Sequence, residues 1–179
     1  MKCIVILLSA MAALVGSEAF ADDKPGIPDE IIKAMDYFVG TWEAKGNVGD
    51  KVRTGGITLR WSPTKDGTKV CLIGRFSYTT GDETLSGTNI IGWNAAKKCL
   101  EDRGFNDLGG SGTLYWFPKS EHLLKGEIIY IKDGEEVHAK ADLVKKGEAE
   151  IVMETVTEDG EVGRVEYTKV KKERKKRKE

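Results

Sequence analysis

The chain has 179 residues, with 28 Lys or Arg against 29 Asp or Glu, and its formal net charge is −1. This balance excludes the strongly basic composition that is typical of nucleic-acid-binding domains, so we expect no specific nucleic-acid partner. The length fits one domain that can bury a substantial core. Three cysteines are too few for the disulfide framework of a small secreted module.

Residues 1–21 are predicted to be a signal peptide. Lys2 supplies a positive start, residues 3–15 are almost entirely apolar, and Ala19-Phe20-Ala21 has the small residues of a cleavage site. The alternative is a membrane anchor, which needs about 20 apolar residues, and this run is shorter. We therefore expect no transmembrane segment and an exported protein, periplasmic or secreted, cleaved after Ala21.

A short helix is predicted at residues 28–37, at the start of the domain that we assign to residues 22–170. Pro28 suits a first helical turn, and Ile31, Met35 and Phe38 recur at helical spacing to form one apolar stripe. We expect this helix to cover one end of the structure that follows.

Alternating apolar and polar residues with hairpin-length links then predict about ten strands. They are expected near residues 42–48, 57–61, 70–78, 88–93, 99–105, 114–117, 123–131, 137–143, 150–154 and 165–169. Loops are expected at residues 79–83 and 109–112, and Pro118 is expected to end the sixth strand. Short sequential links favour a single antiparallel up-and-down β-barrel over a Greek-key sandwich. The fold class is therefore all-β with one short N-terminal helix.

The side chains that alternation places inside this barrel are the candidate ligand-binding residues. They are Leu59, Trp61, Val137, Ala139, Ala141, Ile151, Met153 and Tyr167. Small residues among them would leave room for a small apolar or amphipathic ligand, because a ten-stranded barrel is wide enough unless large side chains fill it. The four tryptophans could line such a pocket, although most such aromatics are simply core.

Catalytic and metal-binding patterns do not emerge from the sequence. His138 alternates with charged residues on a predicted solvent face, and His122 follows a turn, so both are predicted to be surface residues. The glycines near Ser111 form neither a nucleotide-binding loop nor a nucleophile elbow. We expect no metal, no cofactor and no enzymatic activity.

Two features leave alternatives open. Glu101 and Arg103 share one face of a strand and Asp102 takes the other, so this segment is either a solvated edge, which we favour, or a polar lining of a cavity. Cys71 and Cys99 could pair, but strands three and five of a meander lie about 9.6 Å apart, beyond disulfide reach. We therefore expect two thiols, at least partly buried.

The segment Tyr37-Phe38-Val39-Gly40-Thr41-Trp42-Glu43 resembles the opening of calycin barrels, the lipocalin-like group. Residues 85–94, 109–112 and Trp116 are similar to a narrower lipocalin-like family, a domain of unknown function in bacterial exported proteins, and the resemblance spans about residues 36–171. It implies a closed barrel without established activity. It also implies a structural latch in which Lys169, where family members usually have Arg, packs over Trp42. The chain departs from the family at residues 99–105, which tend to be aromatic-rich there.

The basic tail, residues 171–179, has no apolar residue and is expected to be disordered. Two functional hypotheses follow. The first is an exported, non-enzymatic barrel that binds a small apolar or amphipathic ligand in its interior. The alternative is a surface interaction module with a filled barrel, whose tail contacts an anionic partner. Neither the ligand nor the oligomeric state follows from the sequence.

Overall fold

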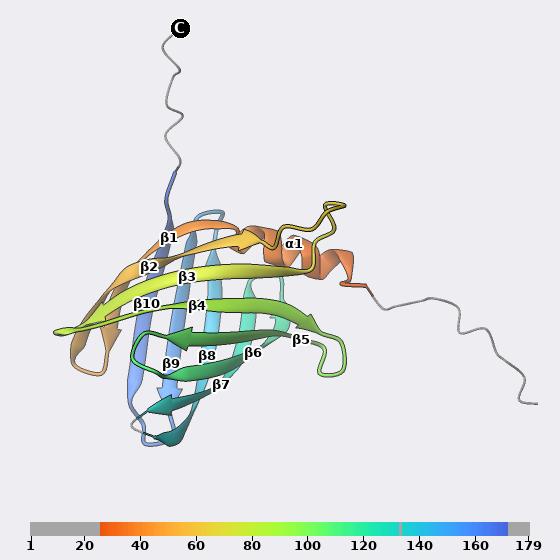
Figure 1. Cartoon of the computed structure of the whole chain (residues 1–179). Helices are drawn as coiled ribbons and strands as arrows, with labels where there is room; N and C mark the ends of the chain where they lie inside the picture. The colour runs from red at the N-terminus through yellow and green to blue at the C-terminus, as the bar shows by residue number, and fades with distance from the viewer. Residues whose placement is uncertain (1–25, 133, 172–179) are drawn as a thin grey trace, which may run out of the picture.

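The computed structural model describes residues 26–132 and 134–171, which form one helix and ten strands (Figure 1). The signal peptide and all but the first residue of the predicted tail lie outside this range. The elements are α1 (Asp29–Phe38), β1 (Gly40–Val48), β2 (Lys51–Trp61), β3 (Cys71–Thr80), β4 (Glu83–Asn94), β5 (Cys99–Asn106), β6 (Ser111–Ser120), β7 (Leu123–Lys132), β8 (Glu135–Lys146), β9 (Glu150–Thr157) and β10 (Val162–Lys169). Among the described residues, no helix is long and apolar enough to cross a membrane.

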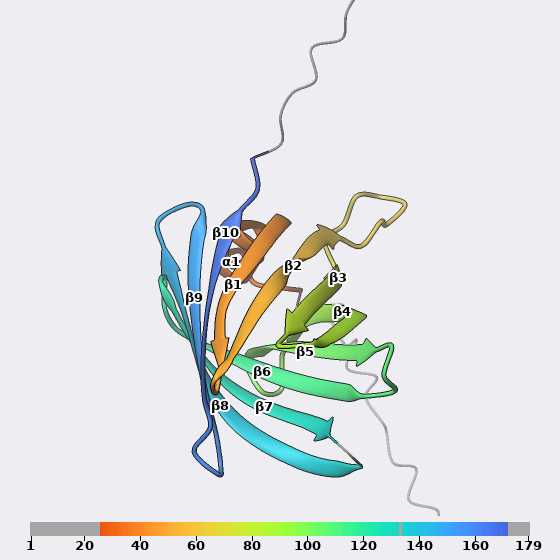
Figure 2. The same ribbon diagram turned by 90° about the vertical axis from the view of Figure 1, so that its left-hand side faces the viewer.

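The strands form a closed barrel in which each strand pairs antiparallel with its sequence neighbours, and β10 pairs back onto β1. This is the predicted up-and-down topology. The strand direction turns gradually around the barrel, so that β2 to β5 run at a large angle to β9 and β10 on the opposite wall (Figures 1 and 2). Closure leaves no exposed sheet edge, which removes the usual site of strand-to-strand aggregation.

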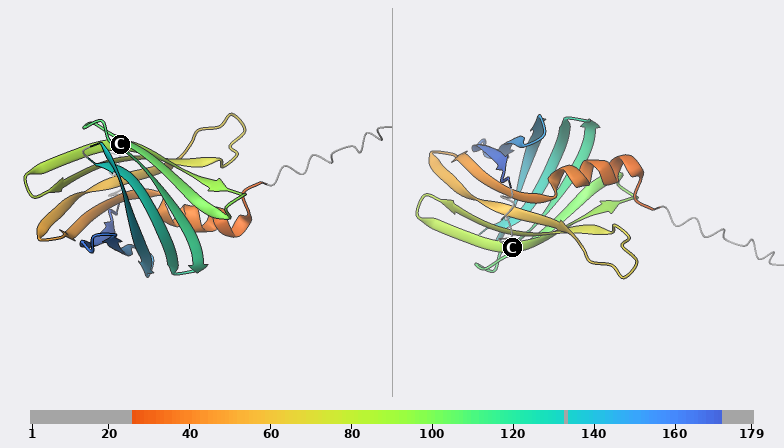
Figure 3. Two further views of the ribbon diagram at one scale, coloured as in Figure 1. Left: turned by 90° about the horizontal axis from the view of Figure 1, so that it is seen from below. Right: turned by 90° about the horizontal axis from the view of Figure 1, so that it is seen from above.

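Helix α1 packs against one end of the barrel, which we call the α1 rim; the opposite end is the far rim (Figure 3). The predicted stripe is buried: Ile31, Met35 and Phe38 belong to the same core cluster as inward side chains of the strands. The helix begins after Pro28, whose carbonyl accepts hydrogen bonds from two backbone amides of the first turn. Apolar burial of this stripe therefore fixes the helix on the barrel.

Each of the ten strands extends beyond its predicted range at one or both ends. Residues 79, 80 and 83 belong to β3 and β4, leaving a two-residue turn in which Gly81 has a positive φ of +59°. Ser111 and Gly112 belong to β6, which also continues through Pro118 to Ser120. Proline is tolerated because the β5–β6 register ends at Trp116, so Pro118 pairs with β7 alone, across a register shift.

Candidate functional site

The inner face of the barrel changes character from one rim to the other. Near α1, the inward side chains are buried in one continuous core cluster. Farther from α1, inward Ala44, Ala139 and Val165 are also buried, whereas nine other inward side chains keep partial accessible surface: Ile57, Phe76, Tyr78, Ile91, Leu114, Ile128, Val137, Met153 and Tyr167. Because their register turns them inward, this accessible surface belongs to the interior. The far half of the inner wall is therefore less completely buried than the half under α1.

The predicted lining residues divide between these two halves. Leu59, Ala141 and Ile151 belong to the buried cluster under α1, and Trp61 packs against it while its Nε1 donates to the Asp36 carboxylate at 2.7 Å. These four help to fill the α1 end. The other four, Val137, Ala139, Met153 and Tyr167, border the less filled half, although Ala139 is only 8% exposed.

A polar pair interrupts the apolar inner wall. Asn89 on β4 is 6% exposed, and its Nδ2 donates to Asp102 Oδ1 on β5 at 2.8 Å. The strand register sets Asp102 between Ile91 and Leu114, so its nearest cross-strand neighbours are apolar. A carboxyl group in such surroundings loses hydration and needs hydrogen bonds in return.

Gly74 on β3 makes room for this pair. A Cβ atom there would lie 1.9 Å from Asn89 Oδ1, so only glycine lets the amide lie against the neighbouring strand. Asn89 Oδ1 itself is buried without a hydrogen-bond partner among the described residues. An unsatisfied buried acceptor costs about 1–3 kcal/mol, and such exceptions tend to mark sites with a role other than packing.

Two phenols lie near the polar pair. The side chains of Tyr78 on β3 and Tyr167 on β10 lie close enough to influence each other's pKa across the interior. The Arg53 guanidinium lies 5.8 Å from the Tyr78 ring centroid, and its Nε donates to Thr80 Oγ1 at 2.9 Å. The phenols therefore experience a positive charge from β2 and a negative one from β5.

Burial shifts the pKa values of the three acidic groups in the same direction. Desolvation raises the pKa of Asp102 from 3.8 to about 6, and the hydrogen bond from Asn89 limits the rise. Desolvation also raises the pKa values of Tyr78 and Tyr167, against the effect of Arg53, which lowers both. At neutral pH the phenols are hydrogen-bond donors, and Asp102 is largely a carboxylate.

Residues 101–103 were predicted to be either a solvated edge or a polar lining of a cavity, and the structure divides them between the two faces of β5. Glu101 and Arg103 form an ion pair on the outer face, but β5 pairs with a strand on both sides, so this segment is not the solvated edge that we favoured. Asp102 points inward, and its partner is Asn89 rather than a charged residue of its own strand. The companions of Asp102, which are Asn89, Tyr78 and Arg53, were not identified from the sequence. Alternation signals an inward Asp102, but pairing across strands requires the register.

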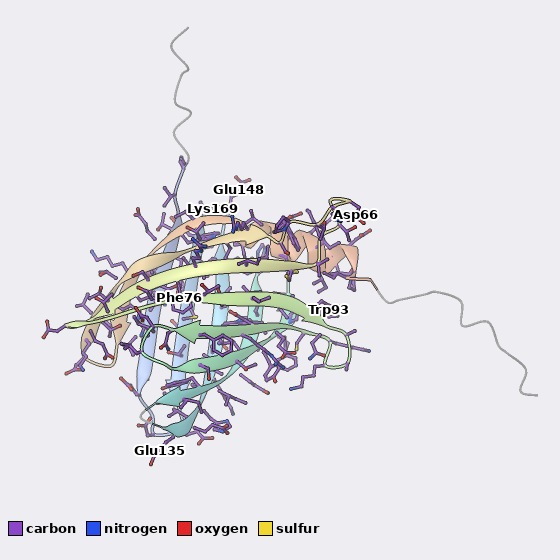
Figure 4. All side chains as sticks on the ribbon, viewed as in Figure 1. Asp66, Phe76, Trp93, Glu135, Glu148 and Lys169 are labelled. Atoms are coloured by element: carbon purple, nitrogen blue, oxygen red, sulfur yellow. The ribbon has the colours of Figure 1, made fainter. Side chains whose placement is uncertain are left out.

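Lys169 and Trp42 meet at the α1 rim. The Lys169 ammonium lies 5.1 Å from the Trp42 ring centroid, within the distance expected for a cation–π contact. Lys169 Nζ also donates to the carbonyl of Tyr37 at 2.9 Å, and Trp42 Nε1 donates to that of Phe38 at 2.7 Å. Figure 4 shows Lys169 near Glu148 of the β8–β9 turn and far from Glu135 at the far rim. The latch therefore connects β1 and β10, the two strands that close the barrel, to the C-terminal end of α1.

Other predicted features lie outside the interior. His138 is exposed and pairs with Glu136 at 2.9 Å, and His122 is exposed. Among the described residues, no group of three or more His, Cys, Asp or Glu side chains could hold a metal ion. Cys71 on β3 and Cys99 on β5 are both free thiols, the second fully buried, with β4 between them.

The outer face of the barrel carries two adjoining grooves. One, of about 470 Å³, lies over β7, β8 and β9, and the other, of about 240 Å³, lies over β5 to β8. They share Ile129, and between them they include Phe105, Ile131 and Val156. Phe105 is 70% exposed. These grooves give the described outer surface an apolar area that a surface interaction module could use.

No protein-family model matches the chain, and no curated protein matches it in sequence. Among solved structures, the S-type phycobiliprotein lyase CPES from Guillardia theta is similar at a TM-score of 0.52, with 8% identity over 82% of this chain and all of the lyase chain. A de novo designed fluorescence-activating β-barrel has 16% identity and a TM-score of 0.45, covering 76% of this chain and 97% of its own. The redesigned barrel mFAP1, bound to DFHBI, has 13% identity and a TM-score of 0.42, covering 76% and 98%. At 8% identity the likeness to the lyase shows a shared barrel fold and no specific family.

Proposed function

We propose that this protein is an exported, non-enzymatic β-barrel of the lipocalin-like kind that binds a small amphipathic ligand in its interior. The observation that supports the proposal is the asymmetry of the inner face. One half is packed under α1, whereas the other combines accessible apolar side chains with the polar pair of Asn89 and Asp102. A concave apolar surface with a few oriented polar groups is typical of ligand sites.

A non-enzymatic role fits the chemistry of the polar groups. Asp102 accepts a hydrogen bond from an amide, and burial raises the pKa values of the nearby phenols further above neutral pH. Proton transfer needs a donor and an acceptor with pKa values near the working pH on either side of a substrate. An amide-held carboxyl suits hydrogen bonding to a ligand better than it suits such a relay.

Binding can be tested by native mass spectrometry of the protein purified from its own host. We expect a non-covalent adduct in the wild type and its loss in Gly104→Leu. A Cβ atom at Gly104 would contact Asn89 Cβ at an ordinary 3.5 Å, so leucine fits the backbone and extends into the interior. Thr88→Leu, on the exposed outer face of β4, is the matched control. An adduct that survives Gly104→Leu, or a wild-type barrel that is always empty, would contradict interior binding.

Export is tested by intact mass of the secreted or periplasmic fraction. We expect the mass of a chain that begins at Asp22, because the small residues Ala19 and Ala21 precede the proposed cleavage site. A mass that retains residues 1–21 would replace the exported form with an anchored one.

The second hypothesis, a surface interaction module, draws support from exposed Phe105 on the outer face and from the basic composition of residues 171–179. Each Lys or Arg near an anionic surface contributes about 1 kcal/mol, and salt weakens the attraction. At low salt, vesicles containing anionic lipid should then bind the full chain but not a chain truncated before Lys171. Equal binding by both forms would exclude the tail as an electrostatic contact.

A further inference from the structure

Asp102 is a carboxyl group on the inner wall without a cationic partner. Its hydrogen bond comes from the neutral amide of Asn89, and no Lys or Arg in the described part of the chain forms an ion pair with it. Arg53 is the nearby inward cation, and it lies against Tyr78 and Thr80 instead. A desolvated carboxylate compensated by one amide is an unfavourable arrangement for an empty barrel.

The second acceptor beside it is also unsatisfied. Asn89 Oδ1 is buried without a partner among the described residues, and Gly74 holds it in that position. Because Asn89 Oδ1 lies against Gly74, the Asp102 carboxylate is the acceptor of this pair that a donor from the interior could reach. A ligand that brought N–H groups would satisfy this corner of the interior in a way that an acceptor such as a carboxylate would not.

The surroundings of this corner are apolar. Ile91 and Leu114 flank Asp102 in the register, and Ile128 follows Leu114 on the next strand. All three retain accessible surface, so they can contact a ligand body. The positively charged guanidinium of Arg53 lies beside Tyr78 and Tyr167 rather than beside Asp102.

From this geometry we infer that Asp102 is the anchor for an organic ammonium: an amphipathic molecule whose protonated nitrogen donates to the Asp102 carboxylate while its apolar body lies against β4, β6 and β7. This inference rests on the proposed interior binding and names the class of ligand. The ammonium supplies both the missing donors and the missing positive charge, whereas an alcohol supplies one donor and no charge. A fatty acid would add a second negative charge beside Asp102, so the interior discriminates against it.

Protonation of Asp102 should make the affinity for an ammonium depend on pH. Burial raises the pKa of Asp102 to about 6, so a growing fraction of the anchor is neutral as the pH falls below that value. The titratable or charged groups that face it from other strands are Tyr78 on β3, Tyr167 on β10 and Arg53 on β2. Burial raises the pKa values of both phenols, which therefore stay neutral between pH 5 and 8, so a change of affinity in this range reports Asp102.

The test compares three probes of equal chain length, octylamine, octanol and octanoate, by isothermal titration calorimetry on the mature chain at pH 7.5. We expect octylamine to bind about tenfold more tightly than octanol, which corresponds to one charge-assisted hydrogen bond, and octanoate to bind most weakly. Asp102→Asn should remove the preference for the amine but keep octanol binding. Glu101→Gln, its neighbour on the outer face, should leave all three affinities unchanged.

The outcomes separate this inference from the proposed function. If all three probes bind and the Asp102→Asn variant, folded by its thermal melt, keeps the same preference, interior binding holds and the ammonium anchor is overturned. Equal affinity for octylamine and octanol in the wild type would overturn it as well. If no probe binds to the wild type, or Gly104→Leu leaves binding intact, interior binding itself fails and the anchor fails with it.

Discussion

Replacing Asp102 with Asn should change how stability depends on pH. The pKa of this carboxyl rises from 3.8 to about 6 on folding because burial disfavours the charged form. The folded state therefore binds the proton more tightly than the unfolded state does. The contribution of Asp102 protonation to the free energy of unfolding is fully present below about pH 4 and is lost as the pH rises through about 6.

The magnitude follows from the size of that rise. An increase from 3.8 to about 6 corresponds to about 3 kcal/mol of unfolding free energy. Asp102 retains some accessible surface, so this figure is an upper value. Relative to the wild type, Asp102→Asn should gain up to about 3 kcal/mol between pH 4 and pH 7.

Urea unfolding of both proteins at a series of pH values measures this difference directly. Taking the difference at each pH cancels the other titrating groups, which are common to both chains. The matched control is Glu101→Gln. Hydrogen bonds from Asn94 and Arg103 lower the pKa of Glu101 below its ordinary 4.5, so this variant should lose stability at neutral pH and approach the wild type as the pH falls through that lowered pKa. If the difference between wild type and Asp102→Asn is constant from pH 4 to 7, Asp102 is not buried as described.

Three further predictions concern the packing around the site. In urea melts, Lys169→Ala should lower the unfolding free energy by about 1 kcal/mol, because it removes the cation–π contact with Trp42 and the hydrogen bond to the Tyr37 carbonyl. Lys169→Met keeps the aliphatic part of the side chain and should lower it less. Equal losses in the two variants would contradict a contribution from packing of this aliphatic part. Gly74→Ala should cost about 1–3 kcal/mol, because its Cβ would overlap Asn89 Oδ1, whereas Gly104→Ala should be tolerated. By displacing Asn89, Gly74→Ala should also raise the pKa of Asp102 above about 6, as carboxyl NMR titration would show. Thiol titration of the denatured mature chain without reductant should find two reactive thiols, whereas a count of zero would require a disulfide between β3 and β5.

The local pattern determined the fold class because each element follows from nearby residues. Alternation defined which face of each strand is apolar, and turn residues such as Gly81-Asp82 set hairpin-length links, so an up-and-down barrel was the simplest topology. The stripe of Ile31, Met35 and Phe38 similarly identified the helix and its buried face. Strand ends were less predictable, because pairing with neighbours extends a strand through weak formers such as Gly112 and Pro118.

The functional site depended on the tertiary structure. The sequence placed Tyr167 and Met153 on the inner face, but only α1, by filling one end, decided which inward residues remain accessible. The pairing of Asn89 with Asp102 is a contact between strands, and it requires the β4–β5 register and the space left by Gly74. Alternation assigns a side chain to a face, whereas its depth, its partner and therefore its pKa are set by groups that are distant along the chain.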